Sequence, residues 1–210
     1  APASAALERF RPLLDASTEE ARTFGTFPTL FLGMVGPDGS IETYGGRLRL
    51  MSADGRIVAD QLDAAAAKSL LRESVEPWSY LKSPYYAPLG SVDGAYRVGP
   101  LARLNVADRC GTPLADRELA RFKALANGPV LASFHYHYAR LVEIVFALER
   151  IGQLLDTPVA VGTDVLPKAS RNRLHAVGMS EAPRGTLFHD YTVDMDGLRS
   201  EEHTSELQSP

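Results

Sequence analysis

Residues 181–191 read Glu-Ala-Pro-Arg-Gly-Thr-Leu-Phe-His-Asp-Tyr and place a guanidinium inside a Pro-Arg-Gly triplet. Proline fixes φ and lacks a backbone donor, and glycine lets the chain turn or approach another group closely. Arginine is always charged, planar and weakly hydrated, so a rigid turn can direct it into a pocket at a modest cost in entropy. The triplet alone is more typical of an ordinary loop with a surface salt bridge. The longer string favours a functional site at Arg184.

This longer string resembles the arginine motif of nickel–iron hydrogenase large subunits. Three further stretches agree with that family: YRVGPLARLN at 96–105, VEPWSYLK at 75–82 followed by PYY at 84–86, and HYARLVE at 137–143. The second and third of these are similar to the soluble, NAD-reducing branch. The four blocks follow one another in the family's order, and the resemblance runs from about residue 27 to residue 197.

The resemblance implies a nickel–iron centre with cyanide and carbon monoxide ligands, held by four cysteines in two Cys-x-x-Cys pairs. Soft thiolates suit such metals. The chain contains one cysteine, Cys110, whose surroundings (Asp-Arg-Cys-Gly-Thr) match neither pair. We therefore expect no metal ligand and no bound cofactor in this chain, although the intact protein would carry the centre. Cys110 is interpreted as a small buried side chain rather than a ligand or nucleophile.

The missing cysteine pairs predict that the chain is an internal fragment, cut at both ends. Residues 199–210, RSEEHTSELQSP, match the translation of a sequencing adapter and do not resemble hydrogenase. A natural polar tail is the alternative interpretation. We expect one incomplete domain over residues 1–198 and disorder over residues 199–210, which are excluded from inferences about function.

Composition excludes several classes of protein. Apolar residues make up 45% of the chain and charged residues 23%, which is ordinary for a globular domain. The net charge is −4, and −2 without Arg199 and the three glutamates of the 199–210 stretch, so neither nucleic acid nor an anionic membrane surface is indicated. No apolar run is long enough to span a membrane. A single cysteine fits a reducing compartment, and the resemblance implies a cytoplasmic protein.

The hydrophobic pattern predicts an α+β fold that is predominantly helical, with a small antiparallel meander near the N-terminus and a long central bundle helix. Helices are expected over residues 4–21, 114–126 and 130–155, the last with apolar positions through Leu148 and Leu155 spaced for a bundle core. Apolar and alternating runs at 29–35 and 47–51, separated by Asp-Gly turns, predict the meander.

The remaining segments have weaker patterns. Asp63 is expected to cap a helix that continues to about residue 75. Proline and aromatic residues over 77–94 predict an irregular lid packed by its own rings, with contact to a partner as the less favoured interpretation. Residues 164–176 are expected to be a polar linker, and residues 191–193 a strand.

The resemblance implies roles for residues around the arginine motif. Arg184 would be catalytic, with its guanidinium over the open side of the metal centre, where it could polarise hydrogen, relay a proton or bond a cyanide. Ala182 and Pro183 would line the pocket around the iron's diatomic ligands. Glu181 would orient the turn and His189 would support the site by hydrogen bonding.

Two charged residues of the expected long helix complete the candidate set. Arg140 and Glu143 are spaced i,i+3 and could pair with each other, either on the helix surface or towards the interior, where they would frame the site. His135 and His137 lie two positions apart, point to different faces of a helix and are interpreted as structural.

The function implied is that of the hydrogen-activating subunit, which interconverts hydrogen with protons and electrons, and the fragment itself is expected to be inactive. Electrons would leave through an iron–sulfur small subunit, and through a diaphorase module to NAD.

One alternative is the metal-free, quinone-binding relative from respiratory NADH dehydrogenase, which carries a similar Glu-Ala-Pro-Arg/Lys-Gly string. Thr186, where that relative usually has Glu, together with His189 and the 98–105 block, favours hydrogenase. The other alternative is a non-catalytic helical interaction module.

Overall fold

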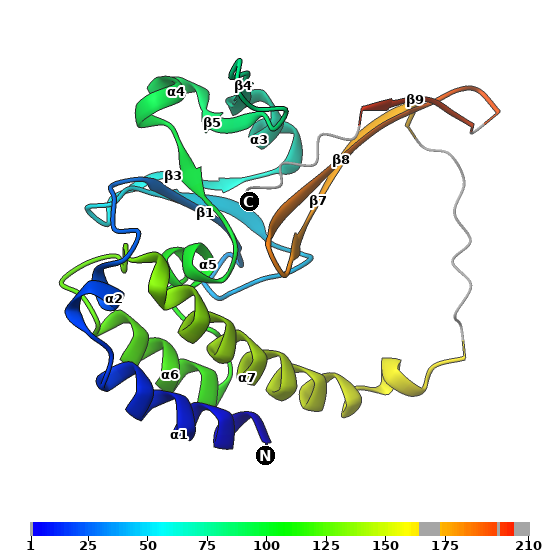
Figure 1. The fold of residues 1–210 in the computed structure, drawn as a ribbon. Coiled ribbons are helices and arrows are strands. Elements are labelled where there is room, and N and C mark those ends of the chain that lie inside the picture. The colour runs from blue at the N-terminus through cyan, green and yellow to red at the C-terminus, as the bar shows by residue number, and fades with distance from the viewer. Residues whose placement is uncertain (1, 164–172, 197, 204–210) are drawn as a thin grey trace.

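The computed structural model describes residues 2–163, 173–196 and 198–203, and its centre is a four-stranded sheet in the order β3-β2-β1-β6 (Figure 1). β1 (Leu30–Val35) pairs antiparallel with β2 (Arg47–Met51), which pairs antiparallel with β3 (Ile57–Leu62). The expected meander is therefore confirmed, and the short β6 (Tyr96–Arg97) extends it in parallel on the other side of β1. All six residues of β1 are buried, as expected for a continuous apolar run covered on both faces.

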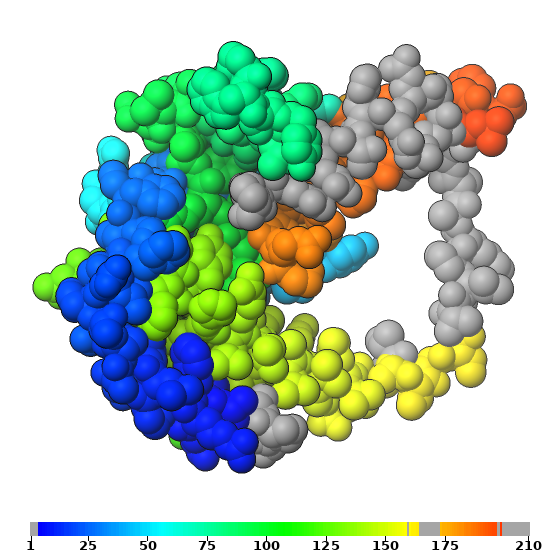
Figure 2. Space-filling model, viewed as in Figure 1, coloured from blue at the N-terminus to red at the C-terminus, as the bar shows by residue number. Residues whose placement is uncertain are grey.

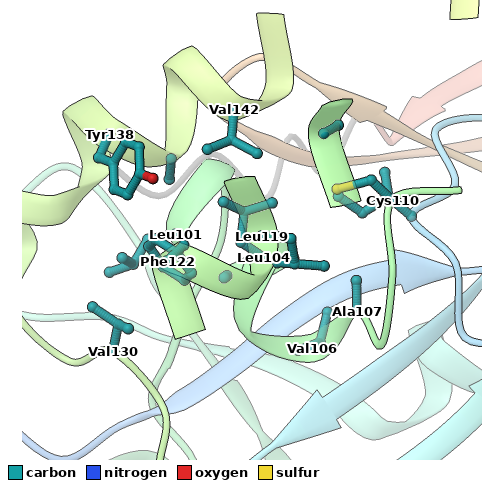
Figure 3. Close-up of a cluster of buried hydrophobic side chains, with 14 of the residues drawn as sticks. Leu101, Leu104, Val106, Ala107, Cys110, Leu119, Phe122, Val130, Tyr138 and Val142 are labelled. Atoms are coloured by element: carbon teal, nitrogen blue, oxygen red, sulfur yellow. The ribbon is translucent and has the colours of Figure 1, made fainter. Parts of the chain in front are cut away.

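A helical layer covers one face of this sheet (Figure 1). It consists of α1 (Pro2–Asp15), α2 (Glu19–Thr23), α5 (Pro100–Val106), α6 (Pro113–Lys123) and α7 (Tyr136–Leu155). Every residue of α5 is buried. The close-up in Figure 3 shows its side chains Leu101 and Leu104 gathered with Phe122 of α6 and Val142 of α7. A second apolar cluster fills the opposite face of the sheet, below α3 (Ala64–Leu70).

The long helix α7 is covered only over its N-terminal half. Tyr138, Val142 and Val145 are buried, whereas Leu148 and Leu155, expected in a bundle core, are exposed by 47% and 69%. The physical reason is that no element of the described residues packs on that face. In the space-filling view this end of the helix, in yellow-green, reaches out from the body of the molecule (Figure 2).

The predicted helices need correction at their ends: the one expected over 130–155 begins only at Tyr136, and the one expected over 114–126 ends at Lys123. The helix expected over residues 4–21 is interrupted after Asp15, and a second helix, α2, begins at Glu19. Thr18 caps its N-terminus, because the Thr18 hydroxyl accepts a hydrogen bond from the amide of Ala21 at 3.2 Å. Asp63 caps α3 as expected, but that helix stops at Leu70, because the next residues form β4 (Leu71–Ser74) and gain backbone partners in β5 (Ser83–Tyr86).

The lid expected over 77–94 is only partly irregular. It contains β5, the 3-10 turn η1 (Ala87–Leu89) and the short helix α4 (Gly90–Asp93). Trp78 and Tyr80 are exposed rather than packed on neighbouring rings. The prediction of a segment held together by its own aromatic residues is therefore wrong, because β5 is held by its ladder with β4.

The arginine motif lies in a separate three-stranded sheet of β7 (His175–Ala182), β8 (Gly185–Val193) and β9 (Arg199–His203). The strand expected over 191–193 thus begins at Gly185. β9 corrects the expectation of disorder for the first part of 199–210, since an exposed strand edge offers free backbone groups to any extended segment. Residues 204–210, and most of the expected linker at 164–176, lie outside the described residues. The α+β class is confirmed.

Candidate active site

Arg184 stands at the tip of the β7–β8 hairpin. Ala182 pairs with Gly185, so that Pro183 and Arg184 form a two-residue connection, and both are exposed. Proline contributes a fixed φ at this point and gives up no ladder hydrogen bond there. The motif is therefore a hairpin with a rigid tip, and Arg184 is presented at its end.

The hairpin tip packs closely against the loop that leads into α5. Gly99 has a φ of +83°, and a Cβ built on it would lie 2.7 Å from the carbonyl oxygen of Arg184. A Cβ on Gly185 would lie 2.4 Å from Cγ2 of Val98. Both positions require glycine for close approach, and Gly99 also for its backbone conformation. Two of the sequence blocks, 96–105 and 181–191, thus meet at the tip.

A buried arginine lies directly beneath the tip. Arg103 of α5, with 4% of its side chain exposed, donates from Nε and Nη2 to the two oxygens of Glu143 at 2.6 and 2.8 Å. Its Nη1 donates to Glu181 at 2.7 Å and to the carbonyl of Ala182 at 2.9 Å, and its Nη2 donates to the carbonyl of Pro183 at 3.3 Å. These contacts use all five N–H donors of a guanidinium.

Glu181 connects this cluster to the central sheet. Its carboxylate, 2% exposed, accepts hydrogen bonds from the amide of Met34 at 2.9 Å and the hydroxyl of Thr186 at 3.0 Å, besides that from Arg103. Burial raises the pKa of Glu181 even though Arg103 opposes the rise. Burial on its own would lower the pKa of Arg103. Glu143 and Glu181 together raise it by more than that, so the pKa of Arg103 lies above its ordinary value and the guanidinium stays charged. The predicted role of Glu181 near the turn now has defined contacts.

Arg140 and Glu143 do not pair with each other. Glu143 points inward and takes both of its hydrogen bonds from Arg103, whereas Arg140 is exposed. The i,i+3 pair is thus wrong, because the buried Arg103 offers Glu143 a bidentate partner away from solvent. Arg103 belongs to the 96–105 block but was not predicted as a site residue. The signal that could have identified it is a lone charge within the apolar helix Pro100–Val106.

Two cavities lie on either side of the tip. One, of about 460 Å³, is lined by Arg103, Glu143, Ile144 and the residues 181–183, among others. The other, of about 500 Å³, is lined by Arg97, Tyr136 and Arg184 among others. Pro100 and Arg140 border both. The structure thus brings Ala182 and Pro183 to one cavity and Arg184 to its neighbour, with Arg140 between them.

His189 lies further along β8, away from the tip. Its Nδ1 is 3.1 Å from the hydroxyl of Tyr191, and the two rings are stacked with centroids 5.8 Å apart. Because the backbone rises by about 3.3 Å per residue along a strand, each residue of β8 between the tip and His189 takes the histidine further from Arg184. No contact of His189 reaches the tip within the part of the chain that the structure describes, so its supporting role stays a prediction.

Among the described residues, no group of three or more His, Cys, Asp and Glu side chains could hold a metal ion. Cys110 is buried, and burial, followed by the charge of Asp116, raises the pKa of its thiol to about 12. The residues present therefore do not fit a thiolate-held metal centre. Nor is any helix of the described ranges long and apolar enough to cross a membrane.

Comparison with known proteins gives a consistent result, although no protein-family model matches the chain. The chain is 38% identical over 194 residues to a subunit of the F420-non-reducing hydrogenase vhu from Methanococcus voltae, a match that covers 91% of this chain and 45% of that protein. It is also 38% identical over 178 residues to the NAD-reducing hydrogenase HoxS subunit beta of Cupriavidus necator, covering 83% of this chain and 36% of that one.

Solved structures agree. An NAD+-reducing [NiFe]-hydrogenase in the H2-reduced state superposes with a TM-score of 0.87 at 38% identity, covering 94% of this chain and 44% of that chain. A Ni-Fe-Se hydrogenase from D. vulgaris Hildenborough, 18% identical, reaches a TM-score of 0.61 over 94% of this chain and 48% of its own, which shows the shared fold. The chain spans less than half the length of these relatives, and over that span it is homologous to hydrogenase subunits.

Proposed function

We propose that this chain is part of the hydrogen-activating large subunit of a nickel–iron hydrogenase, the part that carries the arginine hairpin. The intact enzyme would interconvert hydrogen with protons and electrons. The observation that supports this most directly is the rigid presentation of Arg184 between Gly99 and Arg103, in a chain with 38% identity and a TM-score of 0.87 to an NAD+-reducing [NiFe]-hydrogenase.

In the intact protein, a nickel–iron centre with cyanide and carbon monoxide ligands would supply the bond-breaking chemistry. Its cysteine ligands are absent from this chain, which has only Cys110. What these residues contribute is the surrounding pocket. The Arg184 guanidinium is a permanently charged donor that would stabilise negative charge and donate hydrogen bonds to the reacting group. Ala182 and Pro183 would form the apolar wall next to it.

The other candidate residues would support Arg184. Glu181 and Glu143 both form ion pairs with Arg103 beneath the hairpin tip, and Arg140 borders both cavities. His189 would act through hydrogen bonds along β8. Because the thiolates are missing, we propose that this chain alone is inactive.

The partners and the electron acceptor are part of the same proposal. An iron–sulfur small subunit would take the electrons, and a diaphorase module would pass them to NAD in the cytoplasm. The names of the Cupriavidus necator relative and of the NAD+-reducing structure support NAD. The equally similar relative from Methanococcus voltae is an F420-non-reducing hydrogenase. The acceptor therefore needs its own assay.

The test uses the full-length subunit that contains this chain, assembled with its partners. Arg184→Lys and Arg184→Ala are compared with Arg150→Ala, a change on the exposed part of α7. We expect H2/D2 exchange, which needs no electron acceptor, to fall by about 10²–10³ in Arg184→Ala with nickel and iron content unchanged. Full exchange activity in that variant would overturn the proposal. Protein that binds no nickel would favour the quinone-binding relative or an interaction module. NAD and other acceptors are then compared in the unsubstituted enzyme.

A further inference from the structure

We propose that Arg103 is a positioning residue for Arg184: its guanidinium clamps the two carbonyl groups that precede Arg184 and so fixes the direction of the hairpin tip. The inference rests on the proposed function, since it concerns how Arg184 is held for that reaction. Arg103 is buried and its hydrogen bonds go to the hairpin backbone and to two carboxylates, not to the guanidinium at the tip.

The clamp holds two successive peptide groups. Arg103 donates to the carbonyl of Ala182 at 2.9 Å and to that of Pro183 at 3.3 Å. The carbonyl carbon of Pro183 is bonded to the amide nitrogen of Arg184, so the second contact defines the peptide plane from which Arg184 starts. Gly99 in turn lies against the carbonyl oxygen of Arg184 itself, 2.7 Å from where a Cβ on Gly99 would stand. Three consecutive carbonyl groups are thus restrained by α5 and the loop before it.

The Arg103 guanidinium is itself held by two carboxylates from two different elements. Glu143 of α7 holds Nε and Nη2 in a bidentate pair, and Glu181 of β7 holds Nη1. Glu181 is in turn bound to the amide of Met34 in β1, and its own amide donates to the carbonyl of Thr43 at 2.8 Å. The position of the hairpin tip is therefore tied to the central sheet and to the long helix, both of which have buried cores.

Only an arginine can fill this position. Five N–H donors in one plane serve two carboxylates and two carbonyls simultaneously, and the buried carboxylate of Glu181 would be left without its charged partner if they were lost. A lysine keeps the charge but offers a single compact ammonium with three donors, which cannot span Glu143, Glu181 and both carbonyls. Arg103→Lys therefore keeps the positive charge of the cluster but loses hydrogen bonds to the two carbonyl groups, so the effect of the clamp can be measured apart from that of the charge.

The experiment compares Arg103→Lys with Arg49→Lys in the full-length, assembled enzyme. Arg49 is a matched control, because it is also a largely buried arginine that binds two carboxylates, Asp60 and Asp108, but it does not touch the hairpin. Hydrogen–deuterium exchange of the backbone over residues 179–188 gives a readout that does not depend on activity. We expect at least tenfold faster exchange at the tip in Arg103→Lys and no change there in Arg49→Lys.

Kinetics provide the second readout. In Arg103→Lys we expect kcat for hydrogen oxidation to fall 10- to 100-fold at unchanged KM and unchanged metal content, and the further change Arg184→Lys to add little in that background. The positioning role would be overturned if the losses of kcat in Arg103→Lys and Arg184→Lys multiply in the double variant. It would also be overturned if Arg103→Lys keeps full activity and its hairpin tip exchanges hydrogen no faster than in the unsubstituted enzyme. If Arg184→Ala alone also leaves activity intact, the proposed function fails instead. Should Arg103→Lys not fold, Arg103→Met with Glu143→Gln and Glu181→Gln removes all three charges of the cluster together, keeps an oxygen acceptor at position 181, and still removes the clamp.

Discussion

Gly99 and Arg184, 85 positions apart in the sequence, are in direct backbone contact: a Cβ on Gly99 would stand 2.7 Å from the carbonyl oxygen of Arg184. The loop before α5 and the arginine hairpin can approach this closely only because position 99 has no side chain. The contact links the two sequence blocks that most clearly resemble hydrogenase, and it makes the hairpin tip sensitive to changes outside the hairpin.

Gly99→Ala should therefore destabilise the protein more than an ordinary change at a glycine with positive φ. Gly90 is the matched control, with a φ of +79° and no atom within 4 Å of its virtual Cβ, against +83° at Gly99. With ψ of 175° at Gly90 and −163° at Gly99, both lie in a region that is essentially restricted to glycine, so we expect Gly90→Ala to cost about 1–3 kcal/mol from backbone strain alone, and Gly99→Ala about 1–3 kcal/mol beyond it because the tip must move. Urea unfolding of both variants measures the difference, and equal losses would show that the contact is not tight.

Gly185→Ala tests the other half of the contact. Its Cβ would lie 2.4 Å from Cγ2 of Val98, which is buried and packed in the cluster on the far face of the sheet. We expect a loss of about 1–3 kcal/mol from overpacking. Val98→Ala removes Cγ2 but keeps its own Cβ, 2.9 Å from the added Cβ, so it should relieve the clash in part and make the double variant more stable than the two single losses predict. Gly178→Ala in β7, with no atom within 4 Å, is the control that should change little. A strictly additive double variant would contradict this explanation.

Cys110 should be unreactive in the folded protein. Burial raises the pKa of its thiol to about 12, so at pH 8 only about 10⁻⁴ of the thiol is ionised, against roughly a quarter for a free thiol of pKa about 8.5. Because the thiolate is the form that reacts, alkylation by iodoacetamide should be slow at pH 8 and rise about tenfold per pH unit up to the pKa. Mass spectrometry with and without denaturant measures this. Rapid labelling at pH 8 without denaturant would contradict the burial of Cys110 among Ala107 and its neighbours (Figure 3).

The cap of α3 provides a local test. Asp63 accepts a hydrogen bond from the amide of Ala66 at 2.8 Å. Asp63→Ala should lower the free energy of unfolding by about 1 kcal/mol, and Asp63→Asn, which also caps well, by much less. Thermal unfolding of the two variants makes the comparison. If both lose stability equally, the charge of Asp63 rather than its hydrogen bond stabilises the helix.

The predictions that the structure confirms are those that depend on near neighbours. The buried run of β1, the antiparallel meander and the Asp63 cap follow from residues a few positions apart. The wrong ones depend on distant partners. The helix after Asp63 ends early because β4 finds β5, and Leu148 is exposed because nothing in the described part of the chain covers it. Periodicity reports which face of a helix is apolar, but not whether another element packs on that face.

The candidate site divides in the same way. The Pro-Arg-Gly triplet by itself determined that Arg184 is presented at a rigid turn, since proline and glycine act on their own backbone. Which groups hold that turn was decided only by the tertiary structure. Arg103 selects Glu143, 40 positions away, and Glu181, 78 positions away, although Arg140 lies much nearer to Glu143 in the sequence. Burial explains the choice, because α5 places Arg103 out of water, where its charge and all five donors need partners in the protein. Arg140 on α7 is exposed, so water can serve its donors instead.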